Sequence, residues 1–211
     1  MHIYIIAQYL HLAGPGEDQL LRLGREMIFQ GHQVTVFTIS SGSDLQLGRK
    51  KIGLVQQQGV PLVTFNAPYA RDMSAGKKLL SYWRFARMVG RQGRLLPKPD
   101  LILAVSPPLT AARPALQLSD HHGVPLVLEI RELWPDEPLK RGTLRGGLPE
   151  KAARRLEHQL YSGARQIIAA NEMIGTALRE RAGEGAQITV LDQNINEQEL
   201  INKYIAVLKK I

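Results

Sequence analysis

The stretch Pro125–Asp136, P-L-V-L-E-I-R-E-L-W-P-D, decides the fold and indicates where the chemistry lies. It begins with an apolar run that is typical of a strand buried on both faces of a parallel sheet. Charged and aromatic residues follow at once, and ligands of open α/β sheets bind beyond the carboxyl ends of the strands. The stretch therefore predicts one wall of a ligand-binding cleft. A structural alternative stays open, in which Arg131 pairs with Glu129 or Glu132 beneath a core-filling Trp134.

Segments with strand and helix character alternate on both sides of this stretch. Besides the strand that opens it, strands are expected at residues 3–8, 33–39, 62–65, 100–105, 166–170 and 187–191. Helices are expected at residues 17–30, 75–96, 109–121, 149–162 and 172–182, with loops at 40–61 (with room for a short helix near 43–57) and 132–148. This alternation predicts an α/β fold with a single Rossmann-like, doubly wound, mostly parallel sheet of about 6–7 strands and helices on both faces.

Residues 192–211 differ in composition from the rest of the chain, because they contain three lysines and no arginine. Their apolar residues recur at helical spacing, which predicts an amphipathic helix with Asn194 or Asn196 near its N-cap. We therefore expect a Rossmann-like domain over residues 1–191, and a junction with a C-terminal helix over 192–211 that packs back on that domain. The shift in composition indicates a segment of separate origin.

The overall composition bounds the class of protein. A chain of 211 residues, 44% of them hydrophobic, can form one substantial domain, and it contains no apolar run long enough to predict a transmembrane helix. The lack of cysteine excludes disulfides and thiolate metal sites and fits a cytoplasmic protein. The formal charge of +8 favours an anionic partner, which leaves nucleic acid, an anionic membrane surface and a phosphorylated substrate.

A glycine-bearing loop follows the first expected strand. Gly14 and Gly16 flank a proline just before the first helix, where free backbone N–H groups can hold a phosphate or a sugar oxygen. The loop matches the dinucleotide-binding fingerprint weakly, because Gln19 stands at the third glycine position. A tight turn that needs glycine is the structural alternative. His11 in the same loop is a further candidate, whereas the spacing of the histidines predicts no metal site.

Polar residues also stand at the ends of two other expected strands. Ser106 ends the fourth strand and Asn171 follows the sixth, so both are expected to line the same cleft as Pro125–Asp136. For Asn171, a plain capping role at the start of the next helix is the alternative. A nucleophilic role for Ser106 is not expected, because the G-x-S-x-G elbow is absent.

The helix expected at 75–96 combines basic and aromatic residues. The residues that we expect to face a membrane are Lys77, Lys78, Tyr82, Trp83, Arg84 and Arg87. A basic amphipathic helix with interfacial aromatics suits an anionic membrane surface, where each basic residue contributes about 1 kcal/mol. An ordinary surface helix whose aromatic residues lie in the core explains the same pattern. No nucleic-acid partner is expected, because no recognised binding module is present.

Three segments together resemble the N-terminal half of family-four glycosyltransferases of the GT-B type, close to the bacterial enzymes that build O-antigen and capsular sugars. The segments are REMIFQGHQVTVFT at 25–38, KPDLILAVSPPL at 98–109 and GVPLVLEIRELWPD at 123–136. The resemblance covers about residues 1–190, and its most specific part is the last segment.

The resemblance implies a retaining, metal-independent transfer of a sugar from a nucleotide sugar, expected to be UDP-linked, to a sugar or a polyprenyl-diphosphate-linked acceptor, with no other cofactor. By the same resemblance, Gly14 and Gly16 approach the donor diphosphate or the acceptor, and the tryptophan of the 125–136 stretch lines the cleft. Glu132 or Glu129 would take the proton of the acceptor hydroxyl, and Arg131 would offset diphosphate charge.

The resemblance stops before the donor domain of such enzymes, so the chain corresponds to an acceptor-binding half that acts in cell-surface polysaccharide synthesis. The expected partners are a nucleotide sugar, a sugar or lipid-linked acceptor, an anionic membrane surface, and either a separate donor-domain chain or a second copy of this chain. The alternative function is a non-catalytic module or half-enzyme subunit that recruits a lipid-linked acceptor and a donor-domain partner. Either function is expected in the cytoplasm, at the inner face of the plasma membrane.

Overall fold

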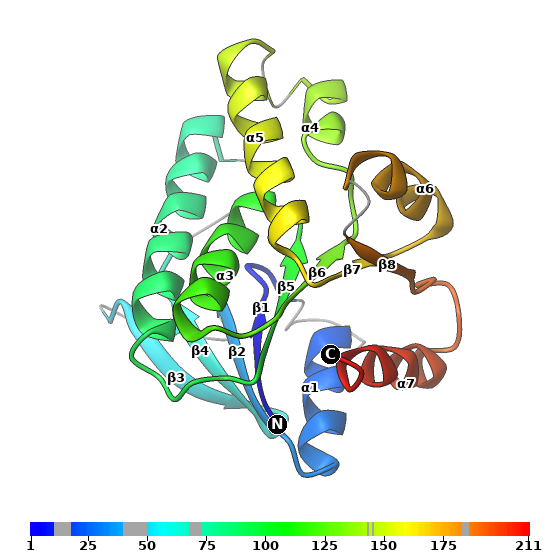
Figure 1. The fold of residues 1–211 in the computed structure, drawn as a ribbon. Coiled ribbons are helices and arrows are strands. Elements are labelled where there is room, and N and C mark those ends of the chain that lie inside the picture. Colours follow the sequence, from blue (N-terminus) through cyan, green and yellow to red (C-terminus); the bar gives the residue numbers. More distant parts are fainter. Residues whose placement is uncertain (11–17, 40–49, 68–72, 143, 145, 183–185) are drawn as a thin grey trace.

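The computed structural model describes residues 1–10, 18–39, 50–67, 73–142, 144, 146–182 and 186–211. The described strands form one sheet in the order β3-β4-β2-β1-β5-β6-β7-β8 (Figure 1). The strands are β1 (His2–Ile6), β2 (Gln33–Ile39), β3 (Ile52–Gln57), β4 (Val60–Phe65), β5 (Leu101–Ser106), β6 (Leu126–Ile130), β7 (Gln166–Ala169) and β8 (Gln187–Val190). The helices are α1 (Gln19–Phe29), α2 (Ala75–Gly93), α3 (Leu109–His122), α4 (Asp136–Lys140), α5 (Leu148–Gly163), α6 (Glu172–Arg181) and α7 (Glu197–Leu208).

The sheet is doubly wound, which confirms the predicted fold class. Neighbouring strands run parallel, apart from the antiparallel pair of β3 and β4. From β1 the chain proceeds through β2 to β4 at one side of the sheet, and from β5 through β6 and β7 to β8 at the other. The strand order therefore reverses between β1 and β5, the place where open α/β sheets form a ligand-binding crevice beyond the carboxyl ends of their strands.

The predicted loop at 40–61 is wrong over its second half, which forms a hairpin. β3 pairs antiparallel with β4, and the connecting residues Gln58 and Gly59 have φ values of 51° and 83°. Such left-handed conformations are those that a two-residue hairpin turn requires. The suggested short helix near 43–57 is likewise wrong for β3, while residues 40–49 lie outside the described residues. The hydrophobic alternation of β3 is weak because none of its residues is buried, so neither face of this edge strand requires apolar side chains.

A short helix, α4, replaces part of the loop predicted at 132–148. Its first residue, Asp136, follows directly after Pro135. Proline interrupts a helix interior, but its fixed φ is compatible with a helix N-terminus, where the missing N–H is not needed. Pro135 therefore lies directly before a helix, which was not apparent from the sequence pattern.

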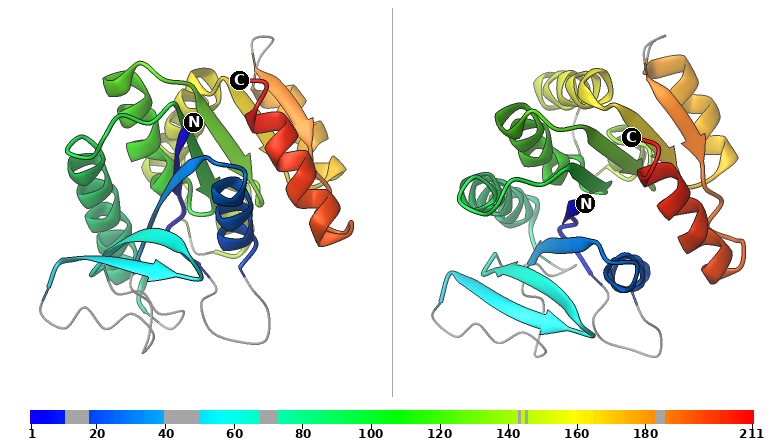
Figure 2. Two further views of the ribbon diagram at one scale, coloured as in Figure 1. Left: turned by 90° about the horizontal axis from the view of Figure 1, so that it is seen from below. Right: turned by 60° about the horizontal axis from the view of Figure 1, so that its bottom comes forward.

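The helices cover both faces of the sheet (Figures 1 and 2). Residues of α2, α3, α5 and α6 pack on one face against an apolar cluster that includes Tyr4, Phe37 and Phe65. Residues of α1 and α7 pack on the other face around alternating strand residues such as Ile5 and Val127. Burial on both faces explains why the central strands read as nearly continuous apolar runs.

The predicted C-terminal helix is confirmed as α7, and it lies beside α1 (Figure 2). Asn196 is its N-cap, and the side-chain oxygen accepts hydrogen bonds from the N–H groups of Gln198 and Glu199. Its buried residues are Leu200, Ile201, Tyr204, Ile205 and Leu208. The helix therefore packs through the apolar stripe that the sequence predicts.

Candidate functional site

The carboxyl ends of the central strands bring several predicted site residues to one edge of the sheet. The backbone N–H of Arg131 donates to the carbonyl oxygen of Ser106 at 3.0 Å, which joins the ends of β6 and β5. The N–H of Ala170 donates to the carbonyl oxygen of Ile130 at 3.0 Å, so Asn171 lies beside the end of β6. Ser106, Arg131 and Asn171 therefore share the edge at which an open α/β sheet binds its ligand.

Glu129 and Arg131 form an ion pair at the end of β6. Arg131 Nε donates to Glu129 Oε1 at 2.5 Å, the Glu129 side chain has no exposed surface, and the Arg131 side chain is 30% exposed. Burial lowers the pKa of Arg131, but the carboxylate of Glu129 outweighs burial and raises that pKa above its ordinary value. The guanidinium therefore stays charged, and the partly exposed Arg131 side chain is available to an anionic ligand.

The C-terminal helix adds a polar neighbour to this ion pair. Tyr204 of α7 is fully buried, and burial raises the pKa of its hydroxyl; the charge of Glu129 adds to the rise, while Arg131 opposes it. Gln193 Nε2 donates to the Tyr204 hydroxyl oxygen at 3.0 Å. Sequence reasoning placed Tyr204 only on an apolar helix face, since no local pattern indicates a contact with β6.

Buried polar atoms gather where the strand order reverses. Gln8, just beyond β1, is 1% exposed, and neither its amide oxygen nor its amide nitrogen has a hydrogen-bond partner among the described residues. The same holds, within those residues, for the hydroxyl of Ser106, for Glu129 Oε2 and for Arg131 Nη2. Buried polar atoms in folded proteins are almost always paired, so these donors and acceptors suit water, a sugar hydroxyl or a phosphate. The signal that could have identified Gln8 is a polar residue at the end of an apolar strand.

The residues that follow β6 include an accessible carboxylate. The Glu132 side chain is 24% exposed, and Glu132 Oε2 lies 3.4 Å from Arg141 Nη2. Trp134 is half-buried and packs against the apolar cluster on the α2 and α3 face. The ion-pair alternative therefore describes Glu129, while Glu132 and Trp134 keep surface that a substrate can contact.

The remaining predicted substrate-binding residues are placed as follows. Asn171 is the N-cap of α6, and its side-chain oxygen accepts a hydrogen bond from the N–H of Ile174 at 2.9 Å. This is the geometry of the capping alternative. Gly14, Gly16 and His11 lie outside the described residues.

Helix α2 divides its aromatic residues between the core and the surface. Phe85 is fully buried, whereas the Trp83 side chain is 57% exposed and lies under the Arg87 guanidinium at 5.7 Å. Leu79 and Leu80 next to them are 62% and 45% exposed. Lys77, Arg84 and Arg87 are exposed, Lys78 and Tyr82 are half-buried, and the helix contains no acidic residue. Within the described ranges, no helix is long and apolar enough to cross a membrane.

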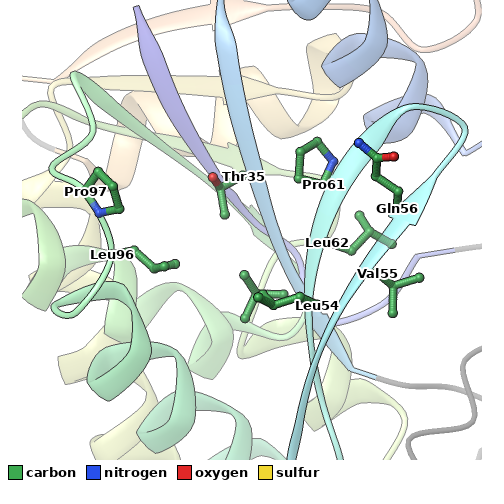
Figure 3. A pocket seen from close by; sticks show the side chains of 9 residues that line it. Thr35, Leu54, Val55, Gln56, Pro61, Leu62, Leu96 and Pro97 are labelled. Atoms are coloured by element: carbon green, nitrogen blue, oxygen red, sulfur yellow. The ribbon is translucent and has the colours of Figure 1, made fainter.

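A separate depression of about 320 Å³ lies at the opposite end of the sheet (Figure 3). Its lining includes Thr35 near the start of β2, Leu54 of the β3 edge strand, and Leu96 and Pro97 just before β5. It is apolar and removed from the carboxyl edge, so we do not assign the site to it. The described part of the chain contains no group of histidine and acidic side chains that could hold a metal ion.

Comparison with known proteins gives a family match over most of the chain and structural matches at low identity. Residues 16–192 match the family described as "Glycosyl transferase 4-like domain". No curated protein matches the chain in sequence.

Several solved structures share the fold. A Thermosynechococcus elongatus sucrose-phosphate synthase structure designated 27_220_406_426 is 12% identical with a TM-score of 0.63, over 100% of this chain and 98% of that one. An E. coli trehalose-6-phosphate structure bound with UDP-2-fluoro glucose is 12% identical with a TM-score of 0.58, over 100% of this chain and 54% of that one. Anabaena Alr3699/HepE in complex with UDP and glucose is 16% identical with a TM-score of 0.53, over 92% of this chain and 45% of that one. The chain thus spans about half of the two longer structures.

Proposed function

The chain belongs to the glycosyl transferase 4-like family, and we propose that it is the acceptor-binding half of a GT-B glycosyltransferase. It helps to move a sugar from a UDP-linked nucleotide sugar to a sugar or a polyprenyl-diphosphate-linked acceptor in cell-surface polysaccharide synthesis. The observation that carries this proposal is the group of buried polar atoms at the carboxyl edge that lack partners among the described residues. The UDP and glucose held by the Anabaena structure support the class of ligand.

In this proposal, Glu132 takes the proton of the acceptor hydroxyl while that oxygen attacks the anomeric carbon on the face from which the nucleotide diphosphate leaves, as retention requires, and the bond from this carbon to the diphosphate breaks. We prefer Glu132 to Glu129 because the Glu132 side chain is 24% exposed, whereas that of Glu129 is fully buried. Glu129 instead fixes Arg131, whose positive charge offsets the charge of the leaving diphosphate. Retention of configuration and independence of a metal ion follow from the family resemblance.

The proposed substrate contacts surround these charged groups. Ser106 and Trp134 contribute from the strand ends, and Asn171 borders them while it caps α6. The residues proposed to complete the site from the loop after β1 are His11, Gly14 and Gly16.

The exposed face of α2 supports an acceptor that is held at a membrane. The helix starts after the carboxyl end of β4 and ends before β5, so its first turns lie at the same end of the sheet as the site (Figure 1). Trp83, Leu79 and Leu80 can enter the lipid interface while the basic residues contact anionic headgroups. We propose that this face brings the site to a lipid-linked acceptor at the inner face of the plasma membrane.

A donor domain is the proposed partner, because the longer matched structures extend well beyond the part that this chain covers. Such a domain, or a second copy of this chain, is proposed to complete the site. We further propose that residues 1–191 are the acceptor domain and that 192–211 are a junction and helix of separate origin. The change in composition after residue 191 supports this division, since residues 192–211 contain lysine but no arginine.

Calorimetric titration with UDP and UDP-glucose tests the proposal. We expect binding tighter than about 1 mM, weakened at least about tenfold by Arg131→Lys, because lysine keeps a counter-charge for Glu129 but loses the guanidinium that meets the diphosphate. Arg179→Lys is the matched control, because Arg179 is an exposed arginine on α6 whose side chain is 52% accessible. If neither ligand binds the wild-type chain, or if Arg131→Lys binds like wild type, the assigned site is wrong. Binding without transfer to added acceptor in the presence of a donor domain would favour the non-catalytic recruiting module.

A further inference from the structure

Asp136, the first residue of α4, is held by two arginines from different helices. Arg154 Nη2 of α5 donates to Asp136 Oδ1 at 2.8 Å, and Arg181 Nη2 of α6 lies 2.5 Å from Asp136 Oδ2. The Asp136 side chain is 17% exposed. Each carboxylate oxygen therefore has its own cationic partner, and one side chain joins α4 to two helices that are distant in sequence.

The two arginines are themselves fixed by a second carboxylate. Glu157 of α5 has a side chain that is 8% exposed, and it lies 3.4 Å from Arg181 Nη1 and 3.7 Å from Arg154 Nη1. Burial raises the pKa of Asp136, but the hydrogen bonds and charges of the two arginines outweigh burial, so the pKa is lowered. The partners of Asp136 are thus held in place from behind, which favours a fixed geometry over the loose pairing of an exposed ion pair.

The contact of Asp136 with the two arginines anchors the segment that carries two candidate site residues. It follows Pro135 and the half-buried Trp134, and Glu132 stands four residues before it. The segment 131–136 therefore begins at β6, where Arg131 is tied to Ser106 and Glu129, and reaches its second attachment at Asp136. Fixing both ends restricts the positions that the side chains between them can adopt.

We propose that Asp136 is a positioning residue that holds Glu132 and Trp134 at the carboxyl edge of the sheet. The effect of Asp136 on catalysis rests on the proposed function, whereas the restraint that it places on residues 131–136 does not. Asp136 contacts no reacting atom in this account; it acts through the segment that carries them. Neither the sequence pattern nor the family match assigns it this role.

Acrylamide quenching of tryptophan fluorescence tests the restraint without any ligand. The chain has two tryptophans, so a Trp83→Phe background leaves Trp134 as the only reporter. In that background, we expect Asp136→Asn to raise the quenching constant of Trp134 at least about twofold, because the amide cannot hold both guanidinium groups. Asp136→Glu should restore at least half of the protection, since it keeps a carboxylate for the two arginines.

The matched control is Glu150→Gln, which removes another carboxylate that contacts Arg154, at 3.2 Å, and leaves Asp136 intact. This variant should quench like the Trp83→Phe parent. If Asp136→Asn also quenches like the parent while far-UV circular dichroism shows a folded chain, the positioning role is refuted. A twofold rise that Asp136→Glu fails to reverse also refutes it, because the effect would then be a general loosening.

Should Asp136→Asn not fold, Arg181→Gln decides the question in the same background. A raised quenching constant supports the restraint, and an unchanged one refutes it, since Arg181 holds one of the two carboxylate oxygens. The outcome is independent of the proposed function, because no nucleotide or acceptor is present. If UDP-glucose does not bind but quenching changes as expected, the restraint by Asp136 is supported and the proposed glycosyltransferase site is refuted.

Discussion

Replacing Arg131 by methionine should strongly destabilise the fold, because Glu129 would lose its counter-charge in a place without solvent. The Glu129 side chain has no exposed surface, and its Oε1 receives the Arg131 Nε at 2.5 Å. Removing one partner of a buried ion pair typically costs about 3–5 kcal/mol, since the other charge stays buried and uncompensated. Against a typical total stability of about 5–15 kcal/mol, such a loss is easily measured.

A double-mutant cycle in urea separates the ion pair from the packing of its side chains. Glu129→Gln should cost less than Arg131→Met, about 1–3 kcal/mol, because the Arg131 side chain is 30% exposed, so its charge is less completely removed from water than that of Glu129. The double variant should be more stable than the sum of the single losses predicts, with a coupling energy of at least about 1 kcal/mol. Arg84→Met on the exposed face of α2 is the control and should change stability by no more than about 0.5 kcal/mol.

Additive losses in this cycle, or a loss below about 1 kcal/mol for Arg131→Met, would refute the reasoning. The assignment of Glu129 as the group that fixes Arg131 would then fail. Glu129 would have to be reached by water or by a ligand, and the choice of Glu132 over Glu129 as the base would lose its support.

Three further outcomes follow from the same contacts. Tyr204→Phe should lower the free energy of unfolding by about 1–2 kcal/mol in urea, because the half-buried amide of Gln193 loses its hydrogen-bond acceptor, and a change below about 0.3 kcal/mol would contradict the described contact. The pKa of Asp136 is lowered in the folded chain, so the contribution of this carboxylate to stability should be complete above about pH 3.9 and be lost as the pH falls through the pKa of the folded state. Asp136→Asn should therefore flatten that part of the plot of stability against pH. An unchanged plot argues against the two-arginine contact. Trp83→Ala should reduce sedimentation with anionic liposomes at low salt severalfold, whereas Phe29→Ala, an 86% exposed aromatic on α1, should not; equal effects would remove the α2 face as the membrane contact.

The sequence predicts the parallel part of the fold well, because its signals are local. Apolar runs such as residues 126–128 follow helices at regular intervals, and burial on both faces of the sheet makes these runs conspicuous. Asn196 identifies the start of α7 by the same kind of short-range chemistry. Edge strand β3 was missed because its residues are half-exposed and its turn, Gln58–Gly59, lacks the usual asparagine or aspartate.

The candidate site could be predicted only in part, because its geometry depends on contacts between distant segments. Ser106 and Arg131 were identified, since they follow apolar strands that a parallel sheet brings to one edge. Tyr204 of α7 lies near Glu129 of β6, and Asp136 of α4 pairs with Arg181 at the end of α6. No spacing rule relates such residues, so only the folded arrangement assigns them a role.

The most direct test of the central claim is a titration of the isotope-labelled chain with UDP-glucose, followed by amide nuclear magnetic resonance. The account predicts that the shifted amides are concentrated at the carboxyl edge, at Ser106, Arg131 and Glu132, and that Arg131→Lys weakens the response because it removes the guanidinium that meets the diphosphate. Shifts confined to the apolar depression around Leu54 and Thr35, or no shifts with millimolar ligand, would contradict a nucleotide-sugar site at that edge.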